Sequence, residues 1–177
     1  MGRVNLLWCN EELFDDYYFI RCDSTDIYWM GHRKKPDYET LKECYMKRLD
    51  TCRFSEVGDK RILLVHYISN TEERNIGQVL LTITSEGIEI GISVLQEYQG
   101  LGIGTDVIKQ VIEIAKQYSD IMIANIRDDN FASQKSFQKN GFQRTNEYVI
   151  NDYPCAGQVK FRKYILTISP LSPAHKT

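Results

Sequence analysis

Residues 88–126 hold the pattern that most constrains the fold, a strand-like segment, a helix-like segment and a second strand-like segment in succession. The outer segments, "IEIGISVL" (88–95) and "DIMIANI" (120–126), are short, apolar and rich in β-branched residues. Between them, residues 103–118 repeat apolar side chains at helical spacing, with charged side chains on the opposite face. A tight turn can join only antiparallel strands, whereas parallel neighbours need a long crossover connection, usually a helix. The pattern therefore predicts one parallel crossover within a sheet.

The rest of the chain surrounds this crossover with further strands and helices. Strand-like runs at 61–69 and 77–84 are separated from each other and from 88–95 by short polar connections, which predicts an antiparallel meander. The other expected elements are a strand at 17–22, a helix at 36–49, a helix at 130–142, and strands at 142–150 and 157–166. We therefore expect an α/β (α+β) fold, with a mixed, mostly antiparallel central sheet and helices on its faces.

Length and composition limit the organisation and the partners. The 177 residues suit one domain, expected over 1–167, with 168–177 as a loose tail. A net charge of −2 and no long apolar run argue against binding to nucleic acid or to a membrane. The five cysteines form no CxxC pair and the three histidines are scattered, so no metal site is expected. Reduced thiols and the absence of a signal-like start predict a cytoplasmic protein.

The stretch "QEYQGLGIG" (96–104) is the candidate binding motif. Glycine disfavours helix and strand, yet this run stands where the helix from 103 begins. Unpaired amides and the helix dipole favour an anion at such a position. The run has no lysine after its last glycine, which excludes a Walker loop, and its GxGxG spacing differs from the dinucleotide fingerprint. Taken alone, the run is either an anion-binding loop or a glycine-rich turn without a ligand.

Two segments together resemble a known family. Gln99-x-x-Gly102-x-Gly104, directly after "IEIGISVLQEY", resembles the acetyl-CoA signature of the Gcn5-related N-acetyltransferases (GNAT). Asn130 and "KNGF" (139–142) are similar to the second characteristic segment of that family. The resemblance covers about residues 60–145, and "A-x-I-x-x-x-N-x-x-S" (124–133) is closest to the branch of the ribosomal-protein serine and alanine acetyltransferases.

The resemblance implies a splayed pair of parallel strands with acetyl-CoA in the gap as co-substrate. The coenzyme pyrophosphate would bind the backbone amides of Gln99, Gly100, Leu101, Gly102, Ile103, Gly104 and Thr105. The backbone of Val94 and Leu95 would lie along the pantetheine arm, and the Ser93 N–H would donate to the thioester carbonyl. Asn130 and Ser133 would line the thiol end.

Direct transfer of an acetyl group to an amine needs a base more than an acid. The amine is protonated near neutral pH, with a pKa of roughly 8 to 10, whereas a thiolate with a pKa of about 8.5 leaves readily. Glu89 is the expected base, directly or through a water molecule; the alternatives are a solvated Glu89, or His66 on the neighbouring strand. Many relatives have a tyrosine acid where this chain has Phe137, so the acid is either Ser133 or solvent.

The acceptor amine is expected between residues 26–38 and 147–157. Trp29, His32 and Arg33 combine aromatic and cationic groups that could hold an aminosugar nucleotide or an acidic polypeptide. A packed aromatic helix followed by a solvated basic turn would give the same sequence. We thus expect an N-acetyltransferase, monomeric or homodimeric, that works in a ternary complex with acetyl-CoA and an amine. The alternatives are an acetyl-CoA-binding sensor module of the same fold and an unrelated nucleotide-phosphate binder, for which the loop lacks a lysine.

Overall fold

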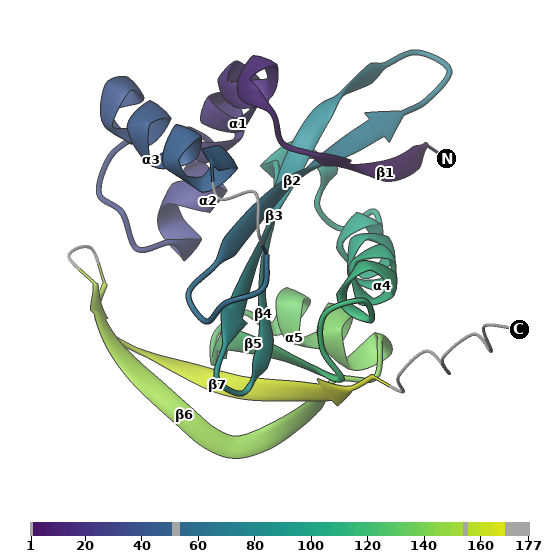
Figure 1. The fold of residues 1–177 in the computed structure, drawn as a ribbon. Helices are drawn as coiled ribbons and strands as arrows, with labels where there is room; N and C mark the ends of the chain where they lie inside the picture. Colours follow the sequence, from purple (N-terminus) through teal and green to yellow (C-terminus); the bar gives the residue numbers. More distant parts are fainter. Residues whose placement is uncertain (1, 51–53, 154–155, 169–177) are drawn as a thin grey trace, which may run out of the picture.

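The computed structural model describes residues 2–50, 54–153 and 156–168, which form one seven-stranded sheet with helices around it (Figure 1). The strand order is β1-β2-β3-β4-β5-β7-β6. The strands are β1 (Arg3–Trp8), β2 (Lys60–Ile68), β3 (Glu73–Thr84), β4 (Gly87–Val94), β5 (Ile121–Arg127), β6 (Gln143–Tyr153) and β7 (Gly157–Thr167). The helices are α1 (Phe14–Arg21), α2 (Ser24–Trp29), α3 (Tyr38–Asp50), α4 (Ile103–Ala115) and α5 (Phe131–Lys139), with 3-10 turns at Glu11–Leu13 and Gln96–Tyr98.

β4 and β5 form the one parallel pair of the described sheet, and they separate almost at once. The register pairs only Ile88 with Met122 and Glu89 with Ile123, while all other neighbouring strands are antiparallel. Gly87 stands at the closed end of this V, where an added Cβ atom would lie 2.5 Å from the carbonyl oxygen of Ile121. The expected sheet, mixed and mostly antiparallel with a splayed parallel pair, is confirmed.

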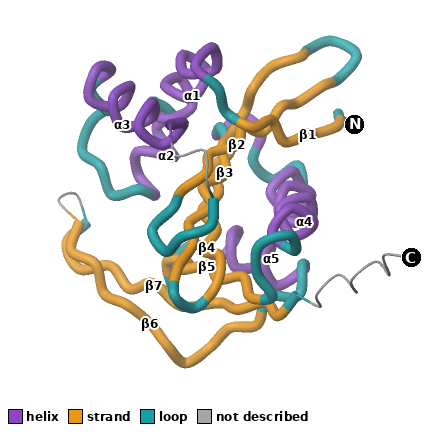
Figure 2. The backbone as a smooth tube through the Cα atoms, in the orientation of Figure 1, coloured by secondary structure: helices purple, strands orange, loops and turns teal. Residues whose placement is uncertain are grey.

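The helices lie on both faces of the sheet, with α1, α2 and α3 on one side and α4 and α5 on the other (Figures 1 and 2). α4 packs against β1, β4 and α5, and α1 packs against β3 and α3. The apolar face of α4 predicted from the sequence is buried; its fully or nearly buried residues are Ile103, Val107, Ile108, Val111 and Ala115. This packing fixes the start of α4 beside the open end of the V.

The first thirty residues differ from the sequence expectation, whereas the helix expected at 36–49 is present as α3. Residues 17–22 are not a strand but lie mostly in α1, because Phe14, Tyr17 and Ile20 recur at helical spacing and all three are buried. The aromatic and β-branched composition of the segment resembles that of a strand, which explains the error. The sequence analysis also missed β1, a short strand that pairs with β2 at the edge of the sheet.

The second half of the fold agrees closely with the expectation. Asn130 caps α5, with its Oδ1 accepting the Ser133 N–H at 3.1 Å. After α5 ends, the Phe142 N–H donates to the Phe137 carbonyl at 3.2 Å, and the two rings pack with centroids 4.9 Å apart. The hydrophobic contact that often accompanies such a helix end is therefore present.

The domain extends to Ile168, which is buried and whose N–H donates to the Asp120 carbonyl. The rest of the expected tail, 169–177, lies outside the described residues, as do Cys52 and Cys155. Cys9, Cys22 and Cys44 are free thiols. Over 2–50, 54–153 and 156–168, no helix is long and apolar enough to cross a membrane, and no cluster of metal-ligating side chains occurs.

Candidate active site

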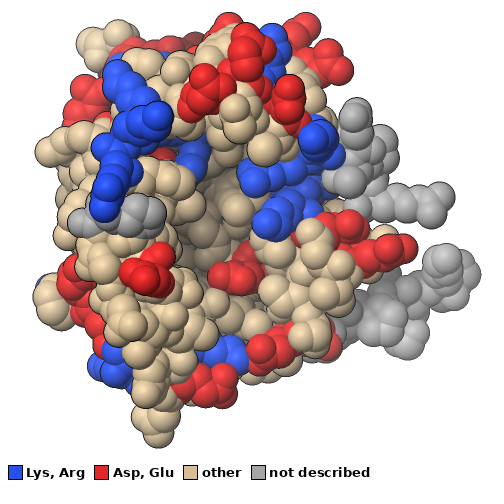
Figure 3. All heavy atoms as spheres, turned by 90° about the vertical axis from the view of Figure 1, so that its left-hand side faces the viewer, with Lys and Arg blue, Asp and Glu red and all other residues tan. Residues whose placement is uncertain are grey.

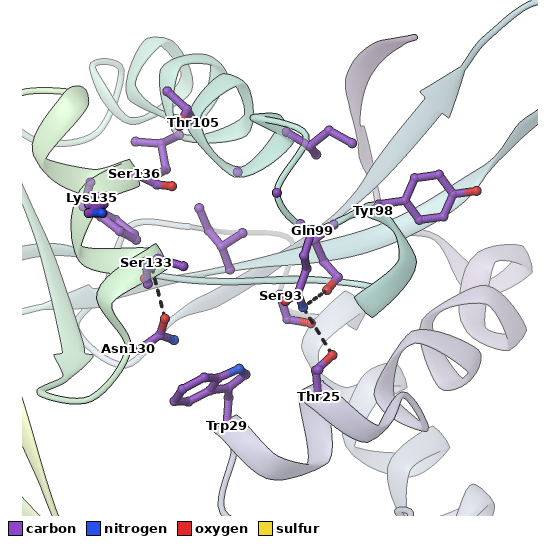
Figure 4. Close-up of a pocket in the computed structure, with 18 of the residues that line it drawn as sticks. Thr25, Trp29, Ser93, Tyr98, Gln99, Thr105, Asn130, Ser133, Lys135 and Ser136 are labelled. Atoms are coloured by element: carbon purple, nitrogen blue, oxygen red, sulfur yellow. Dashed lines mark hydrogen bonds between the residues drawn. The ribbon is translucent and has the colours of Figure 1, made fainter. Parts of the chain in front are cut away.

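A cavity of about 370 Å³ opens where β4 leaves β5, and we call it the loop cavity because the glycine loop forms one wall (Figure 4). Its other walls come from α2, from the end of β4 and from α5, whose Asn130, Ser133, Lys135 and Ser136 are drawn in Figure 4. The predicted site residues that line it are Ser93, Val94, Gln99, Gly100, Gly102, Ile103, Gly104, Thr105, Asn130 and Ser133. The structure therefore brings most of the predicted residues together around one space.

Two of the residues predicted to bind the coenzyme do not line the loop cavity. Leu95 is buried in the core, and its N–H donates to the Ile76 carbonyl at 2.8 Å. The Leu101 side chain is 52% exposed and projects from the loop. Of these two, only the Leu101 backbone is available to a ligand, through its amide.

The loop presents consecutive amides that no described hydrogen bond uses. The Gln99 N–H donates to Gln96 and the Thr105 N–H to Gly102, whereas residues 100–104 donate none of the described bonds. Gly100 and Gly102 have φ values of +78° and +82°, a conformation that side chains other than glycine rarely adopt. A Cβ atom at either position would meet no protein atom within 4 Å. The glycines are thus required by the backbone conformation, and they leave space beside the amides.

Side-chain amides hold the two ends of the loop in place. Gln99 donates through Nε2 to the Val94 carbonyl at 2.9 Å and to the Thr25 hydroxyl at 3.3 Å, so it joins the loop to β4 and to α2. Asn140 donates to the Thr105 and Ser136 carbonyls at 3.0 and 2.9 Å, which joins α4 to α5. The loop is therefore ordered by the protein itself.

A buried polar network lies beneath Ser93. The Ser93 hydroxyl hydrogen-bonds to the Asp26 carboxylate, which also accepts from Gln78 at 3.3 Å and pairs with Arg21 at 2.9 Å. Burial raises the pKa of Asp26, and this rise is opposed by Arg21 and by the hydrogen bonds from Ser93 and Gln78. Sequence reasoning missed Asp26, which only the packing of α2 on the sheet brings to Ser93.

A second cavity of about 250 Å³ adjoins the loop cavity, and we call it the arginine cavity. Its charged lining residues are Arg21 of α1, Arg48 of α3 and Arg127 of β5. Trp29, Ser93, Asn130 and Ser133 line both cavities, so the two spaces meet at these residues. A ligand in one cavity can therefore reach a ligand in the other at Ser93 and Ser133.

The expected base, Glu89, lies farther along β4 on the same face as Ser93. It is four residues before Ser93, so their Cα atoms are about 13 Å apart along the strand. Its Oε1 accepts from Asn125 Nδ2 at 3.0 Å. Asn125 lines the arginine cavity, and together with Glu89 it lines a smaller cavity beside Glu86, Glu147 and Lys163. Glu89 therefore stands next to the arginine cavity without lining it.

Other candidates have different surroundings. His66 bonds to Asn75 at 3.0 Å and to Glu73 at 3.1 Å and lines neither cavity. Of the predicted acceptor residues, Trp29 lines both cavities, whereas His32 and Arg33 are exposed and line neither. Lys135 and Lys139, one turn apart on α5, line the loop cavity and were not predicted. Their spacing at the mouth of the glycine loop would have been a usable signal.

Comparison with known proteins assigns the chain to a family. The model of the Acetyltransferase (GNAT) family matches residues 15–142. The chain belongs to the GNAT family. The match covers more than half of the chain and includes Ser93, Asn130 and Ser133, which line both cavities. The protein is therefore an N-acetyltransferase.

Solved GNAT structures share the fold at low sequence identity. A spermidine N-acetyltransferase from Vibrio cholerae, solved with CoA and spermine, has a TM-score of 0.76 and 13% identity, covering 93% of this chain and 95% of its own. The aminoglycoside acetyltransferase AAC(6')-Ib with coenzyme A has a TM-score of 0.70 and 16% identity, with coverages of 93% and 95%. The yncA protein of Salmonella typhimurium, with its cofactor acetyl-CoA, has a TM-score of 0.70 and 15% identity, with coverages of 97% and 98%. Among curated protein sequences, none matches the chain.

The GNAT chain keeps Phe137 where many relatives would carry a tyrosine acid. The Phe137 ring is buried, packs on Phe142 and lines both cavities. Ser133, one turn earlier on α5, is the nearest hydroxyl on that helix to the meeting point of the cavities. Phe137 cannot donate a proton, so the expected donor at this place stays Ser133 or water.

Proposed function

We propose that this GNAT protein transfers an acetyl group from acetyl-CoA to the amine of a small molecule, directly and within a ternary complex. The observation that carries the proposal is the pair of cavities that meet at Ser93, Asn130 and Ser133 beside the open end of the β4–β5 pair. Two separate spaces with a common opening suit two substrates that react without a covalent enzyme intermediate. Bound in the loop cavity, acetyl-CoA supplies the activated acetyl group.

The residues of the loop cavity fit the phosphates of coenzyme A. The consecutive free amides of 100–104 and the N-terminus of α4 attract the negative pyrophosphate. Lys135 and Lys139 add positive charge from α5. The loop lacks a Walker lysine, and in this setting the phosphates are only held, so no group is required to stabilise their hydrolysis.

The thioester carbonyl would accept its hydrogen bond from the Val94 amide rather than from the Ser93 amide. The Leu95 N–H points to β3, where it donates to Ile76. Because amides alternate in direction along a strand, the Ser93 N–H also points to β3 and the Val94 N–H points into the gap. Ser93 contributes its hydroxyl, which is held by Asp26.

Glu89 would take the proton of the amine through a water molecule. Its hydrogen bond from Asn125 orients the carboxylate at the side of the arginine cavity. The Cα atoms of Glu89 and Ser93 lie about 13 Å apart along β4, so we expect the proton to pass through water rather than directly. On the other side of the reaction, Ser133 or solvent would return a proton to the departing thiolate.

A thiol-release assay with acetyl-CoA and a panel of amines tests this function. The panel should contain amino acids, aminosugars and their phosphates, polyamines, aminoglycosides and short peptides. We expect acetylation of at least one small amine, with the acetylated product verified by mass spectrometry. Tight acetyl-CoA binding with no turnover on any amine would instead support a sensor module of the same fold.

A further inference from the structure

The lining of the arginine cavity is charged with one sign only. Arg21, Arg48 and Arg127 line it, and none of its described lining residues is Asp or Glu. The loop cavity differs, because it is lined by Asp26 as well as by two lysines. Guanidinium groups that line a pocket favour an anionic ligand, to which they can donate charge-assisted hydrogen bonds.

The three arginines are not equivalent. Arg127 makes two hydrogen bonds to Asp129, at 3.0 and 2.8 Å, and its guanidinium lies about 5 Å from the rings of Tyr28 and Trp29. The charge of Arg127 is therefore largely compensated. Arg21 also pairs with a carboxylate, through Nη1 to Asp26 at 2.9 Å, but its buried Nε has no hydrogen-bond partner within the described structure. Arg21 is only 9% exposed, and a buried donor of this kind is costly unless something accepts from it.

Arg21 and Arg48 both affect the phenol of Tyr17 in this cavity. Tyr17 also lines the cavity and lies one turn before Arg21 on α1. Burial raises the pKa of Tyr17, while the positive charges of Arg21 and Arg48 both oppose the rise. Both guanidinium groups are therefore within electrostatic reach of one phenol, which stays protonated and can donate a hydrogen bond. Tyr17 and Arg21 of α1 and Arg48 of α3 thus supply three donors to the wall of one cavity.

The molecular surface has the same polarity. The face of the molecule that carries α3 and the β6–β7 hairpin shows a hollow with Lys and Arg atoms on both sides of its upper part and Asp and Glu atoms below (Figure 3). Glu86, Glu89 and Glu147 line the smaller cavity beside Asn125 together with Lys163, which pairs with Glu86 and Glu147. Lys163 therefore offsets two of the three carboxylates, whereas Glu89, which accepts from the neutral Asn125 amide, can attract an amine.

We propose that the acceptor is a small amine that also carries an anionic group, a carboxylate or a phosphate, and that Tyr17, Arg21 and Arg48 bind this group. This inference rests on the proposed function and specifies its second substrate. The anionic group lies toward α1 and α3, and the amine lies toward Ser93 and the Glu89–Asn125 pair. Trp29 and Phe161 supply apolar surface for the part between them. Polycations of the kind named with two of the structural relatives, spermine and aminoglycosides, would place positive charge against these arginines.

Matched pairs of amines test the inference on the unmodified enzyme. Each pair should differ only in the anionic group: 2-aminoethyl phosphate against ethanolamine, glucosamine 6-phosphate against glucosamine, and amino acids against their amides. Spermidine and kanamycin serve as polycations. We expect kcat/KM to be about 10- to 100-fold higher for the anionic member of at least one pair, as for a charge-assisted hydrogen bond. The phosphate and carboxylate pairs distinguish the two sources of negative charge.

Binding separates this inference from the proposed function. The same pairs are titrated by calorimetry into the protein saturated with coenzyme A, where no chemistry occurs. Tighter binding of an anionic member without any turnover would support the anion site and refute the transferase proposal. Equal or weaker binding of all anionic members, or a preference for polycations, overturns the anion site even if another amine is acetylated.

Arg48 variants locate the anion on the cavity wall. In Arg48→Gln, KM for the anionic amine should rise about tenfold or more, while kcat, KM for its neutral partner and KM for acetyl-CoA stay close to wild type. Arg48→Lys should restore part of the loss. Lys47→Ala is the matched control, because Lys47 precedes Arg48 on α3 but is exposed and lines neither cavity. An equal rise in KM for charged and neutral amines would show a structural defect and contradict the proposed role of Arg48.

Discussion

The loop cavity and the arginine cavity meet at Ser93, yet the first is formed mainly by backbone and the second by side chains. The loop cavity depends on backbone: glycine conformations, consecutive free amides and the start of one helix, most of them within residues 94–105. The arginine cavity depends on side chains from α1, α2, α3, α5, β3, β4, β5 and β7. A ligand common to a whole family can be held by backbone, which varies little with sequence. An acceptor that differs between relatives is selected by side chains, which can change one at a time.

The largest effect should come from Glu89→Gln, which should impair turnover without affecting coenzyme binding in the loop cavity. Loss of a general base should lower kcat/KM by about 10²- to 10⁴-fold, while the Kd for acetyl-CoA, measured by calorimetry, stays unchanged. Glu97→Gln is the control, since Glu97 is exposed and pairs with Arg74 outside both cavities. Full-rate turnover with an unaltered pH profile would remove Glu89 from the mechanism.

Gly102→Val should instead raise the Kd for acetyl-CoA. A side chain at Gly102 is strained at φ +82° and projects beside the free amides, so we expect about 100-fold weaker acetyl-CoA binding. Gly58→Val controls for the strain, because Gly58 has a similar φ of +98° and likewise no atom within 4 Å, but lines neither cavity. The two variants should lose similar stability in thermal unfolding. If both also kept normal affinity, the loop would not be the coenzyme site.

Asp26→Asn tests the network that both cavities share. Because burial raises the pKa of Asp26, the folded state holds this proton more tightly than the unfolded chain. The contribution of Asp26 to stability therefore decreases as the pH rises above 3.8, the ordinary value. Asp129 behaves oppositely, because hydrogen bonds from Arg127 lower its pKa, so its contribution is lost as the pH falls. Chemical unfolding of wild type, Asp26→Asn and Asp129→Asn between pH 3 and 8 should give difference curves of opposite slope.

The smallest effect is expected for Lys135→Ala and Lys139→Ala, where side chains assist the backbone site. Each substitution should weaken acetyl-CoA binding about two- to fivefold at low salt, and the difference should shrink as salt is added. Lys109→Ala, an exposed change on α4 away from the cavity, should leave the Kd unchanged. Salt-independent losses would mean that the two lysines act by packing rather than by charge.

The same contrast explains how much the sequence could predict. The helices expected at 103–118 and 130–142 are local patterns whose meaning depends on neighbours within one turn, and the structure confirms both as α4 and α5. α1 was mistaken for a strand because its aromatic residues suit either structure until the packing partner is known. Asp26, Arg21 and Arg48 come together only when three helices pack on the sheet, so their positions in the sequence did not indicate their roles, although Asp26 begins the segment 26–38 expected to face the acceptor. Conversely, His32 and Arg33 formed a conspicuous local motif that the fold leaves on the surface.

Gly87 decides how wide the gap between β4 and β5 can be, although it is far from the chemistry along the strand. A Cβ atom at Gly87 would lie only 2.5 Å from the Ile121 carbonyl oxygen, so only the hydrogen atom of glycine fits there. This contact limits how closely the two strands can approach. A methyl group there would act as a wedge at the apex of the V and would change the angle between its arms. Because the arms carry Ser93 on one side and Asn125 on the other, such a wedge would alter the separation of the two substrates at once. Reaction geometry in this enzyme is thus set partly by the residue with the smallest side chain, at the end of the strand opposite to the loop.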